Sequence, residues 1–234
     1  MFHQTKGIVL SSIKYAETSV ICKIYTEKFG LISYLINGVR KKKGKSNYYQ
    51  PLSILDMTVY YKQKSSLQRV KEAKPFIQYK AIPFDIKKSS IAMFLAEVLS
   101  KSLNEEEENL SLYYFLETAM EELDSQEFNS QFHLQFLIEL SKHLGFYPND
   151  NNDNYNYFDL LNGQFVSKLP EHTHYLTDTA VFSDLLKGER VDSRIKKRML
   201  EYLLEYYQLH VEGFGKIKSK EILEIVHNAW IGKF

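Results

Sequence analysis

The spacing of apolar residues changes once along this chain, near Pro83, and that change predicts the fold class. Before Pro83, apolar and polar residues alternate in short runs, which is typical of half-buried β-strands. After Pro83, apolar residues recur every three or four positions, which is typical of amphipathic helices. Strands followed by helices predict an α+β protein.

Five strand-like runs precede Pro83, separated by turn residues such as the Asn37-Gly38 pair. In the second run Cys22 shares one face with two aliphatic residues, so we expect a core residue and not a reactive thiol. Five short strands with a long connection after the third predict an OB-type β-barrel over residues 1–80. The predicted strands are Gly7–Tyr15, Ser19–Thr26, Leu31–Ile36, Leu52–Tyr61 and Leu67–Ala73.

Apolar stripes predict three helices after Pro83. Ser89 or Ser90 is expected to cap the first helix, and the third is expected to run from about Phe128 to Leu144 and stop at Gly145. Two stripes are expected to face the core: Phe94, Leu95, Val98, Leu99 and Leu103, and then Leu112, Leu116, Ala119, Met120 and Leu123.

The helical domain is expected to span residues 81–234, with a polar loop and a small hairpin inserted at about 146–180. Residues 149–156 contain only Asn, Asp and Tyr, a composition that cannot bury enough surface to order itself. The pair Asn162-Gly163 then predicts the turn of a hairpin.

Two amphipathic helices are predicted to close the chain, one from Asp192 or Ser193 to Gly213 and one after Ser219. The start of the longer helix carries a basic cluster that is either a solvated face or a secondary contact for DNA or an acidic peptide. The cluster comprises Arg190, Arg194, Lys196, Lys197 and Arg198, and the last helix is expected to turn Ile222, Ile225, Val226 and Ala229 inward.

Charge is distributed unevenly, although the formal net charge is only +1. Residues 1–80 hold 15 Lys or Arg and four Asp or Glu, which is +11, whereas the rest of the chain holds 15 and 25, which is −10. A basic segment joined to an acidic body predicts a polyanionic partner for the basic segment. The alternative interpretation is a soluble domain that is merely rich in lysine.

The most basic segment lies between the third and fourth predicted strands. Residues 40–45 hold five cations in six positions, and two adjacent tyrosines follow. Cationic side chains neutralise DNA phosphates without a fixed register, and aromatic rings offer faces on which bases stack. The predicted DNA-binding residues are Arg40, Lys41, Lys42, Lys43, Lys45, Tyr48, Lys62, Lys64, Arg69 and Lys71.

No pattern in the sequence indicates an enzyme. Motifs for phosphate cradling, a nucleophile elbow and a zinc protease are absent. Dispersed acids such as Glu97, Glu117 and Glu139 would serve a metal-dependent nuclease only if the fold brought them together. His172 and His174 form an isolated H-x-H without a third ligand, so we expect no catalytic residue, metal or cofactor.

Neither a membrane span nor a signal peptide is recognisable in the sequence. No apolar run approaches the roughly 20 residues that cross a bilayer. A single cysteine fits a reducing compartment. We therefore expect a cytoplasmic protein without membrane contact.

Short motifs along nearly the whole chain are similar to those of one family. They are Gly7-Ile8-Val9-Leu10, Tyr15-x-Glu17-x-Ser19, Tyr25-Thr26-x-x-x-Gly30, Gly38-x-Arg40-Lys41, Gln50-Pro51-Leu52, Phe136-Leu137, Leu144-Gly145-x-x-Pro148 and Tyr206-Tyr207-x-x-His210. On these residues the chain resembles the RecO family of recombination mediators.

The resemblance implies an OB-fold DNA-binding domain that binds single- and double-stranded DNA and anneals complementary strands. It also implies partnership with RecR and with the C-terminal tail of the single-stranded-DNA-binding protein while recombinase is loaded. Many family members carry a four-cysteine zinc module where this chain has its Asn/Asp tract and hairpin, so zinc is expected to be absent. The alternative is a general single-stranded nucleic-acid-binding OB protein without a mediator role.

Overall fold

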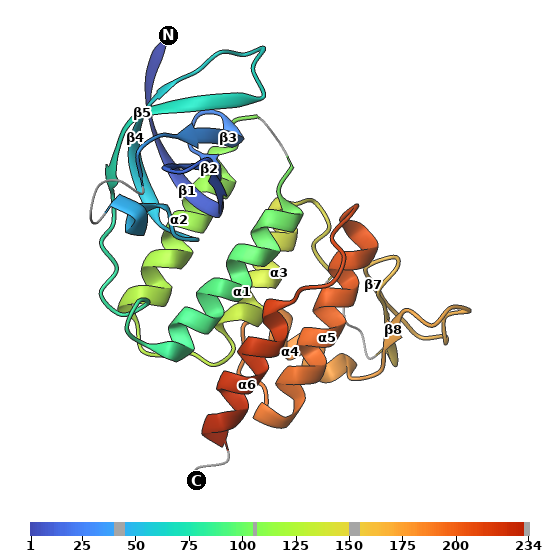
Figure 1. Cartoon of the computed structure of the whole chain (residues 1–234). Coiled ribbons are helices and arrows are strands. Elements are labelled where there is room, and N and C mark those ends of the chain that lie inside the picture. The colour runs from blue at the N-terminus through green and yellow to red at the C-terminus, as the bar shows by residue number, and fades with distance from the viewer. Residues whose placement is uncertain (40–44, 105–106, 150–154, 232–234) are drawn as a thin grey trace. The chain divides into compact units, whose positions relative to one another are not determined.

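The computed structural model describes residues 1–39, 45–104, 107–149 and 155–231, without the side chains of residues 45, 46 and 228–231. The chain divides into two compact units, one formed by residues 1–128 and 217–234 and the other by residues 129–216 (Figure 1). A strand-built barrel opens the first unit, and helices dominate the rest of the chain. The α+β class predicted from the sequence is confirmed.

The barrel closes in the strand order β1-β2-β3-β5-β4, as the OB-type prediction requires. The long first strand pairs with β4 through its first half and with β2 through its second half, which closes the cylinder. Among the strands that the structure describes, only β3 and β5 pair in parallel. The strands are β1 (Phe2–Tyr15), β2 (Ser19–Thr26), β3 (Gly30–Ile36), β4 (Ile54–Tyr60) and β5 (Leu67–Pro75), with a 3-10 helix η1 (Lys45–Tyr49) between β3 and β4.

The first strand begins at Phe2, five residues before the predicted start at Gly7. The segment before Gly7 is largely polar, so its alternation is weak, but register with β4 keeps it in the sheet. Gly7 itself is required by packing, because a Cβ there would lie 2.6 Å from both Ile24 Cγ2 and Met57 Cε.

Cys22 is fully buried in the barrel core, as predicted. It packs in a cluster with Val20, Ile24 and Tyr34. Burial raises the pKa of the thiol, which keeps it protonated and unreactive at neutral pH. Cys22 therefore serves the fold.

Three helices complete the first unit: α1 (Ile86–Ser102), α2 (Leu110–Ser125) and α6 (Ser219–Ile231). Asp85, and not Ser89 or Ser90, caps α1, because its carboxylate accepts the amide of Lys87 at 2.8 Å. A carboxylate at the N-cap also complements the positive end of the helix dipole. The two apolar stripes predicted on α1 and α2 are buried throughout.

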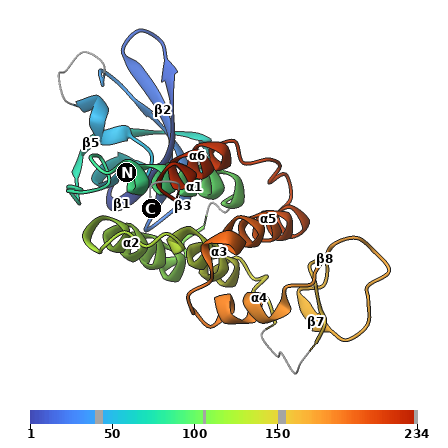
Figure 2. The same cartoon turned by 90° about the horizontal axis from the view of Figure 1, so that it is seen from below.

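Glu97 of α1 binds the segment at which the chain re-enters the first unit. Its carboxylate accepts the amides of Lys218 and Ser219 and the Ser219 hydroxyl, which holds the start of α6. Helices α1 and α6 lie side by side (Figure 2). The predicted inward face of α6 was wrong, since Ile222 and Ile225 are exposed and Leu223 is buried instead.

A partly buried ion pair fastens the barrel to α2. The ammonium of Lys6 on β1 lies 2.8 and 2.9 Å from the two carboxylate oxygens of Glu117. The ring of Phe76 covers this ammonium at 4.2 Å. Nearby, the Asp124 carboxylate accepts three consecutive amides, of residues 80–82, so the connection from β5 to α1 is pinned as well.

The second unit contains α3 (Phe132–His143), α4 (Thr179–Leu186) and α5 (Ser193–His210), and a small sheet of β6 (Tyr157–Asp159), β7 (Gln164–Val166) and β8 (Tyr175–Leu176). The hairpin predicted at Asn162-Gly163 is confirmed, with Gly163 at φ +65°. Gly145 has φ +83° just beyond α3. Helix α4 and strand β8 were not predicted.

Two predicted helix bounds in this unit were too wide. Helix α3 starts at Phe132 and not at Phe128, because the Asn129 side chain accepts the Gln131 amide and forms a turn first. Helix α5 ends at His210 and not at Gly213, since its C-cap residue, Val211, is already extended.

Candidate nucleic-acid interface

The basic loop of the prediction falls largely outside the described residues. Arg40, Lys41, Lys42 and Lys43 are not described, and for Lys45 only the backbone is, as the first residue of η1. The structure therefore fixes only where the loop leaves the barrel, after β3, and where it returns, at η1.

Tyr48, predicted to stack on bases, is half-buried and packs against the barrel core. Its neighbour Tyr49 is buried more deeply, and this burial raises the pKa of Tyr49 to about 12. Both rings anchor η1 to the barrel. Tyr48 thus offers only part of its ring to a ligand.

The other predicted cations lie on one wall of the barrel. Lys62 and Lys64 belong to the β4–β5 loop, and Arg69 and Lys71 project from β5; all four are exposed or nearly so. The loop is held in shape by Gln68, whose side chain bonds the backbone of Lys62 and Ser65. Because Gln68 is buried, these cations stand on an ordered support.

Strand register continues this wall as a row of outward residues around the barrel. Arg69 of β5 pairs with Tyr60 of β4, and Tyr60 pairs with Phe2 of β1. The side chain of Phe2 is 56% exposed and that of Tyr60 36%. On the other side of Arg69, the row continues through Leu35, Ile21 and Ile13.

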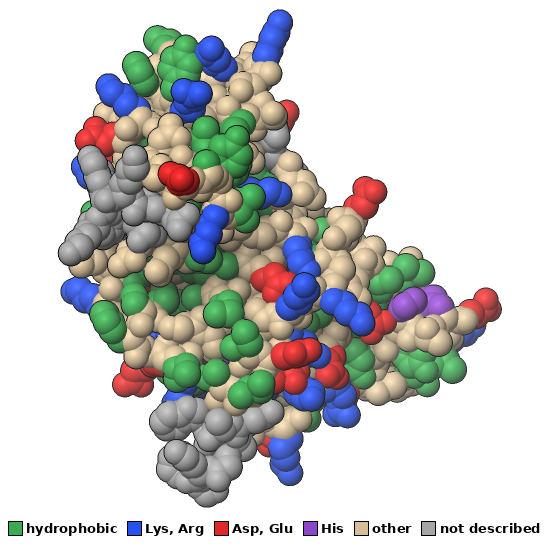
Figure 3. Space-filling view, in the orientation of Figure 1, with side chains coloured by type: hydrophobic (Ala, Val, Ile, Leu, Met, Phe, Trp, Pro, Cys, Tyr) green, Lys and Arg blue, Asp and Glu red, His purple; other side chains and the backbone are tan. Residues whose placement is uncertain are grey.

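Lysine ammonium groups sit over the two aromatic rings of this wall. Lys71 Nζ lies 4.6 Å from the centre of the Phe2 ring, and Lys62 Nζ lies 5.3 Å from that of Tyr60. The two ring centres are 5.5 Å apart in an edge-to-face contact. Figure 3 shows basic and apolar side chains side by side at this end of the molecule, over the barrel.

Within the described part of the chain, no carboxylate lies within ion-pair distance of Lys62, Lys64, Arg69 or Lys71. Lys74, further along β5, is the contrast, with its ammonium 3.3 Å from Asp56. Unpaired exposed cations beside aromatic rings can neutralise phosphates and contact bases. The wall therefore has the chemistry of a nucleic-acid surface.

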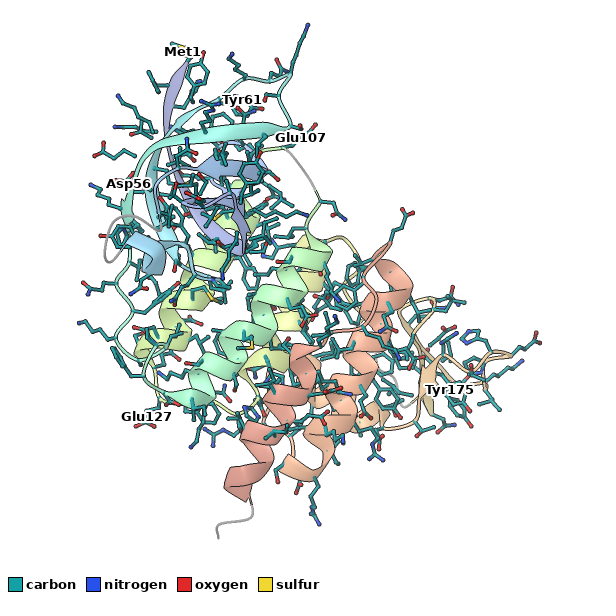
Figure 4. All side chains as sticks on the ribbon, viewed as in Figure 1. Met1, Asp56, Tyr61, Glu107, Glu127 and Tyr175 are labelled. Carbon is teal, nitrogen blue, oxygen red and sulfur yellow. The ribbon has the colours of Figure 1, made fainter. Side chains whose placement is uncertain are left out.

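Sequence reasoning placed the cations of this wall but missed Phe2 and Tyr60. Phe2 lies before the predicted start of its strand. Tyr60 and Tyr61 are adjacent aromatics, and strand alternation turns one outward and the other inward. Tyr61, labelled with Met1 in Figure 4, packs against the core and stacks on Phe29 at 4.2 Å. The pairing of Tyr60 with Phe2 in the sheet shows which of the two tyrosines faces outward.

The acids considered for a nuclease have other roles where their contacts are described. Glu97 holds the start of α6, and Glu117 pairs with Lys6. Burial alone would raise the pKa of Glu97, but hydrogen bonds from Ser219, Lys218 and Lys101 outweigh it and lower the pKa to about 2. The described side chains include no group of three His, Cys, Asp or Glu residues that could hold a metal ion.

The histidines of the H-x-H motif each face an acid. His172 Nε2 lies 3.3 Å from Asp159, and His174 Nδ1 lies 2.7 Å from Glu205. Asp159 in turn accepts the amides of Leu161 and Asn162 and so shapes the hairpin.

Along the described residues, none of the helices combines the length and the apolarity that a bilayer span needs.

Comparison with known proteins matches both parts of the chain to one family. Residues 1–79 match the N-terminal domain of recombination protein O, and residues 83–221 match its C-terminal domain. The chain is 37% identical over 238 residues to the DNA repair protein RecO of Flavobacterium psychrophilum, covering 95% of this chain and 98% of the relative. It is 38% identical over 239 residues to that of Bacteroides fragilis, covering 96% and 98%. The chain therefore belongs to the RecO family of DNA repair proteins.

Proposed function

We propose that this protein is a cytoplasmic recombination mediator that binds single- and double-stranded DNA, anneals complementary strands and helps load recombinase onto DNA. The observation that carries the proposal is the barrel wall, where cations without a described acid partner lie beside two exposed aromatic rings. Family membership supports a role in repair, and the charge of the first 80 residues supports a polyanionic partner.

In this proposal the protein acts by binding and not by catalysis. Annealing two DNA strands requires phosphate charge to be neutralised while base edges remain free to pair. The cations of residues 40–45 together with those of the wall would neutralise the phosphates and leave the base edges free. Incubation with DNA or with ATP and Mg²⁺ should give neither strand cleavage nor nucleotide hydrolysis, and either product would contradict the proposal.

We propose the C-terminal tail of the single-stranded-DNA-binding protein and RecR as the protein partners. An acidic and apolar tail needs an apolar surface next to cations. Helix α6 offers exposed Ile222 and Ile225, with Lys218 exposed just before it. Its neighbour α1 exposes Ile86 and Met93.

The docking proposal is tested by capture of this protein on immobilised single-stranded-DNA-binding protein with and without its tail. We expect capture only by the intact partner, and we expect Ile225→Asp to reduce that capture. Leu161→Asp, which places the same charge at another exposed apolar position, is the matched control and should not reduce capture. Equal capture by both forms of the partner would overturn tail docking.

A general single-strand coating protein is the alternative, and annealing separates the two functions. The experiment is annealing of complementary strands already coated by the cognate single-stranded-DNA-binding protein. A mediator should accelerate annealing of coated strands, whereas a passive coater should compete for bare strands only. Failure to anneal coated strands, with intact binding to bare DNA, would favour the coating protein.

A further inference from the structure

The aromatic part of the barrel wall has a geometry that calls for a specific ligand group. Phe2 and Tyr60 come from different strands, touch edge to face, and remain partly exposed with a lysine over each ring. Single exposed apolar residues are ordinary on protein surfaces. Two contacting rings on adjacent strands, each with its own cation, form a built surface and not a scattered exposure.

We propose that Phe2 and Tyr60 form a stacking platform for unpaired nucleobases, with Lys71, Lys62 and Arg69 holding the phosphates that flank those bases. The inference rests on the proposed function and adds the kind of DNA that this wall selects. Base stacking on aromatic side chains is tolerant of sequence, because every base has a flat face. Lysines beside the rings supply the charge that the backbone needs.

The platform is expected to distinguish single strands from duplex. In a duplex, the face of each base is already covered by its neighbours, so a ring on a convex barrel wall meets only phosphates, sugars and base edges. An unpaired base can turn its face to the ring. The basic loop at residues 40–45, by contrast, contributes charge, which attracts both forms of DNA.

The neighbouring aromatic pair shows why the outward rings are not simply part of the core. Tyr61 follows Tyr60 directly but points the other way, where it stacks on Phe29 and contacts His3 edge to face. Tyr61 and Phe29 both pack against the barrel core. The inward pair has a packing role, whereas the outward pair has no described role in the core.

The test replaces both rings by leucine, which keeps apolar bulk but removes the flat face. The protein should carry any purification tag at its C-terminus, because Phe2 lies next to the N-terminus. Binding of the Phe2→Leu/Tyr60→Leu variant is measured with a fluorescent oligo-dT, with an abasic oligomer of the same length and with a duplex of the same length.

We expect affinity for oligo-dT to fall roughly 5- to 100-fold, as loss of one stacked base implies, with less than about a two-fold change for the abasic oligomer and the duplex. Tyr60→Phe should retain the affinity of the wild type for oligo-dT. Phe84→Leu, which alters an 85% exposed ring outside the barrel strands, is the matched control and should change none of the three. Thermal unfolding of each variant checks that the barrel is intact.

Three outcomes overturn the platform. Unchanged affinity of the double variant for oligo-dT would show that the rings do not contact bases, and equal losses for oligo-dT and the abasic oligomer would show that they act without stacking. In both cases DNA binding itself persists, so the proposed function stands. If the wild type bound none of the three ligands, the proposed function and the platform would fail together.

Discussion

Cations on the barrel wall and cations on the helices have different surroundings. Lys62, Lys64, Arg69 and Lys71 project into solvent or over rings, without a carboxylate at ion-pair distance among the described residues. On the helices, cations are commonly bound to acids or to backbone oxygens. Examples are Lys88 on the carbonyls of Asp124 and Gln126, Lys101 on Glu97, Arg194 on Asp192, Arg198 on Asp178 and Lys220 on Glu224.

The difference explains how a chain with a net charge of +1 can keep a surface of unpaired cations, the surface that we propose for DNA. Acids are concentrated after residue 80, where they pair with cations, cap helices and hold connections. Few acids accompany the cations of the barrel. A count of charges predicts the sign of each half, but only the contacts separate cations that stabilise the fold from cations that remain available to phosphates.

The largest effect is expected from the loop that joins β3 to η1. Replacing Arg40, Lys41, Lys42, Lys43 and Lys45 by alanine should weaken single-strand binding on the order of 100-fold at low salt and reduce the log–log salt slope by about 3, because four to five phosphate contacts are lost. Fluorescence anisotropy at several salt concentrations measures both quantities. The thermal transition should change little, and an unchanged slope would place the DNA elsewhere.

Breaking the partly buried ion pair of Lys6 and Glu117 should have the opposite effect, lowering stability and leaving DNA binding nearly unchanged. Lys6→Met leaves the Glu117 carboxylate, 10% exposed, without its cation, and should lower the free energy of unfolding by about 2 kcal/mol. Chemical denaturation measures this change. The double variant Lys6→Met/Glu117→Leu should recover part of the loss, since it removes the stranded charge. A Lys6→Met variant as stable as the wild type would show that the pair does not fasten the barrel.

Sequence patterns predicted the elements whose neighbours impose a regular period. Strand β2 was predicted with its observed bounds, and the buried stripes of α1 and α2 were correct, because each such element turns one continuous face to a core. Helix α6 failed this rule. Its start is held by Glu97, which lies 122 residues before Ser219 in the sequence. No pattern within the helix shows which face this distant contact turns toward the core.

The candidate site also has one part that the sequence predicts and one part that it does not. Its cations are visible in the sequence because charge is a property of each residue. Lys62 and Lys71 lie over the rings of Tyr60 and Phe2, and Arg69 pairs with Tyr60, so these three cations do share a wall. The aromatic half depends on register between β1, β4 and β5, which is a tertiary property. The position of Tyr48 after the lysines predicts a base-stacking ring, yet this ring packs partly against the barrel core.

A smaller effect on stability is expected at Glu97, the acid that holds the start of α6. Its pKa of about 2 is lower than that of an ordinary glutamate, so this carboxylate stabilises the fold above about pH 4.5 and loses that effect as pH falls toward 2. Glu97→Gln should cost about 1 kcal/mol at neutral pH and flatten the acid side of the stability curve. Denaturation midpoints between pH 2 and pH 7 measure both. Identical pH profiles for variant and wild type would rule out this role.

The smallest effect, and the sharpest contrast with Lys6, is expected at Lys71. Lys71→Met removes an ammonium that lies over Phe2 and is paired with no described acid, so the free energy of unfolding should change by less than about 0.5 kcal/mol. Single-strand affinity should fall only a few-fold, and the salt slope should decrease by about 0.7, the value for one phosphate contact. The same substitution at two lysines of one barrel would thus lower stability in one case and DNA affinity in the other. If Lys71→Met destabilised the barrel as Lys6→Met does, the distinction between paired and available cations would not hold, and the wall would be part of the fold's own electrostatics.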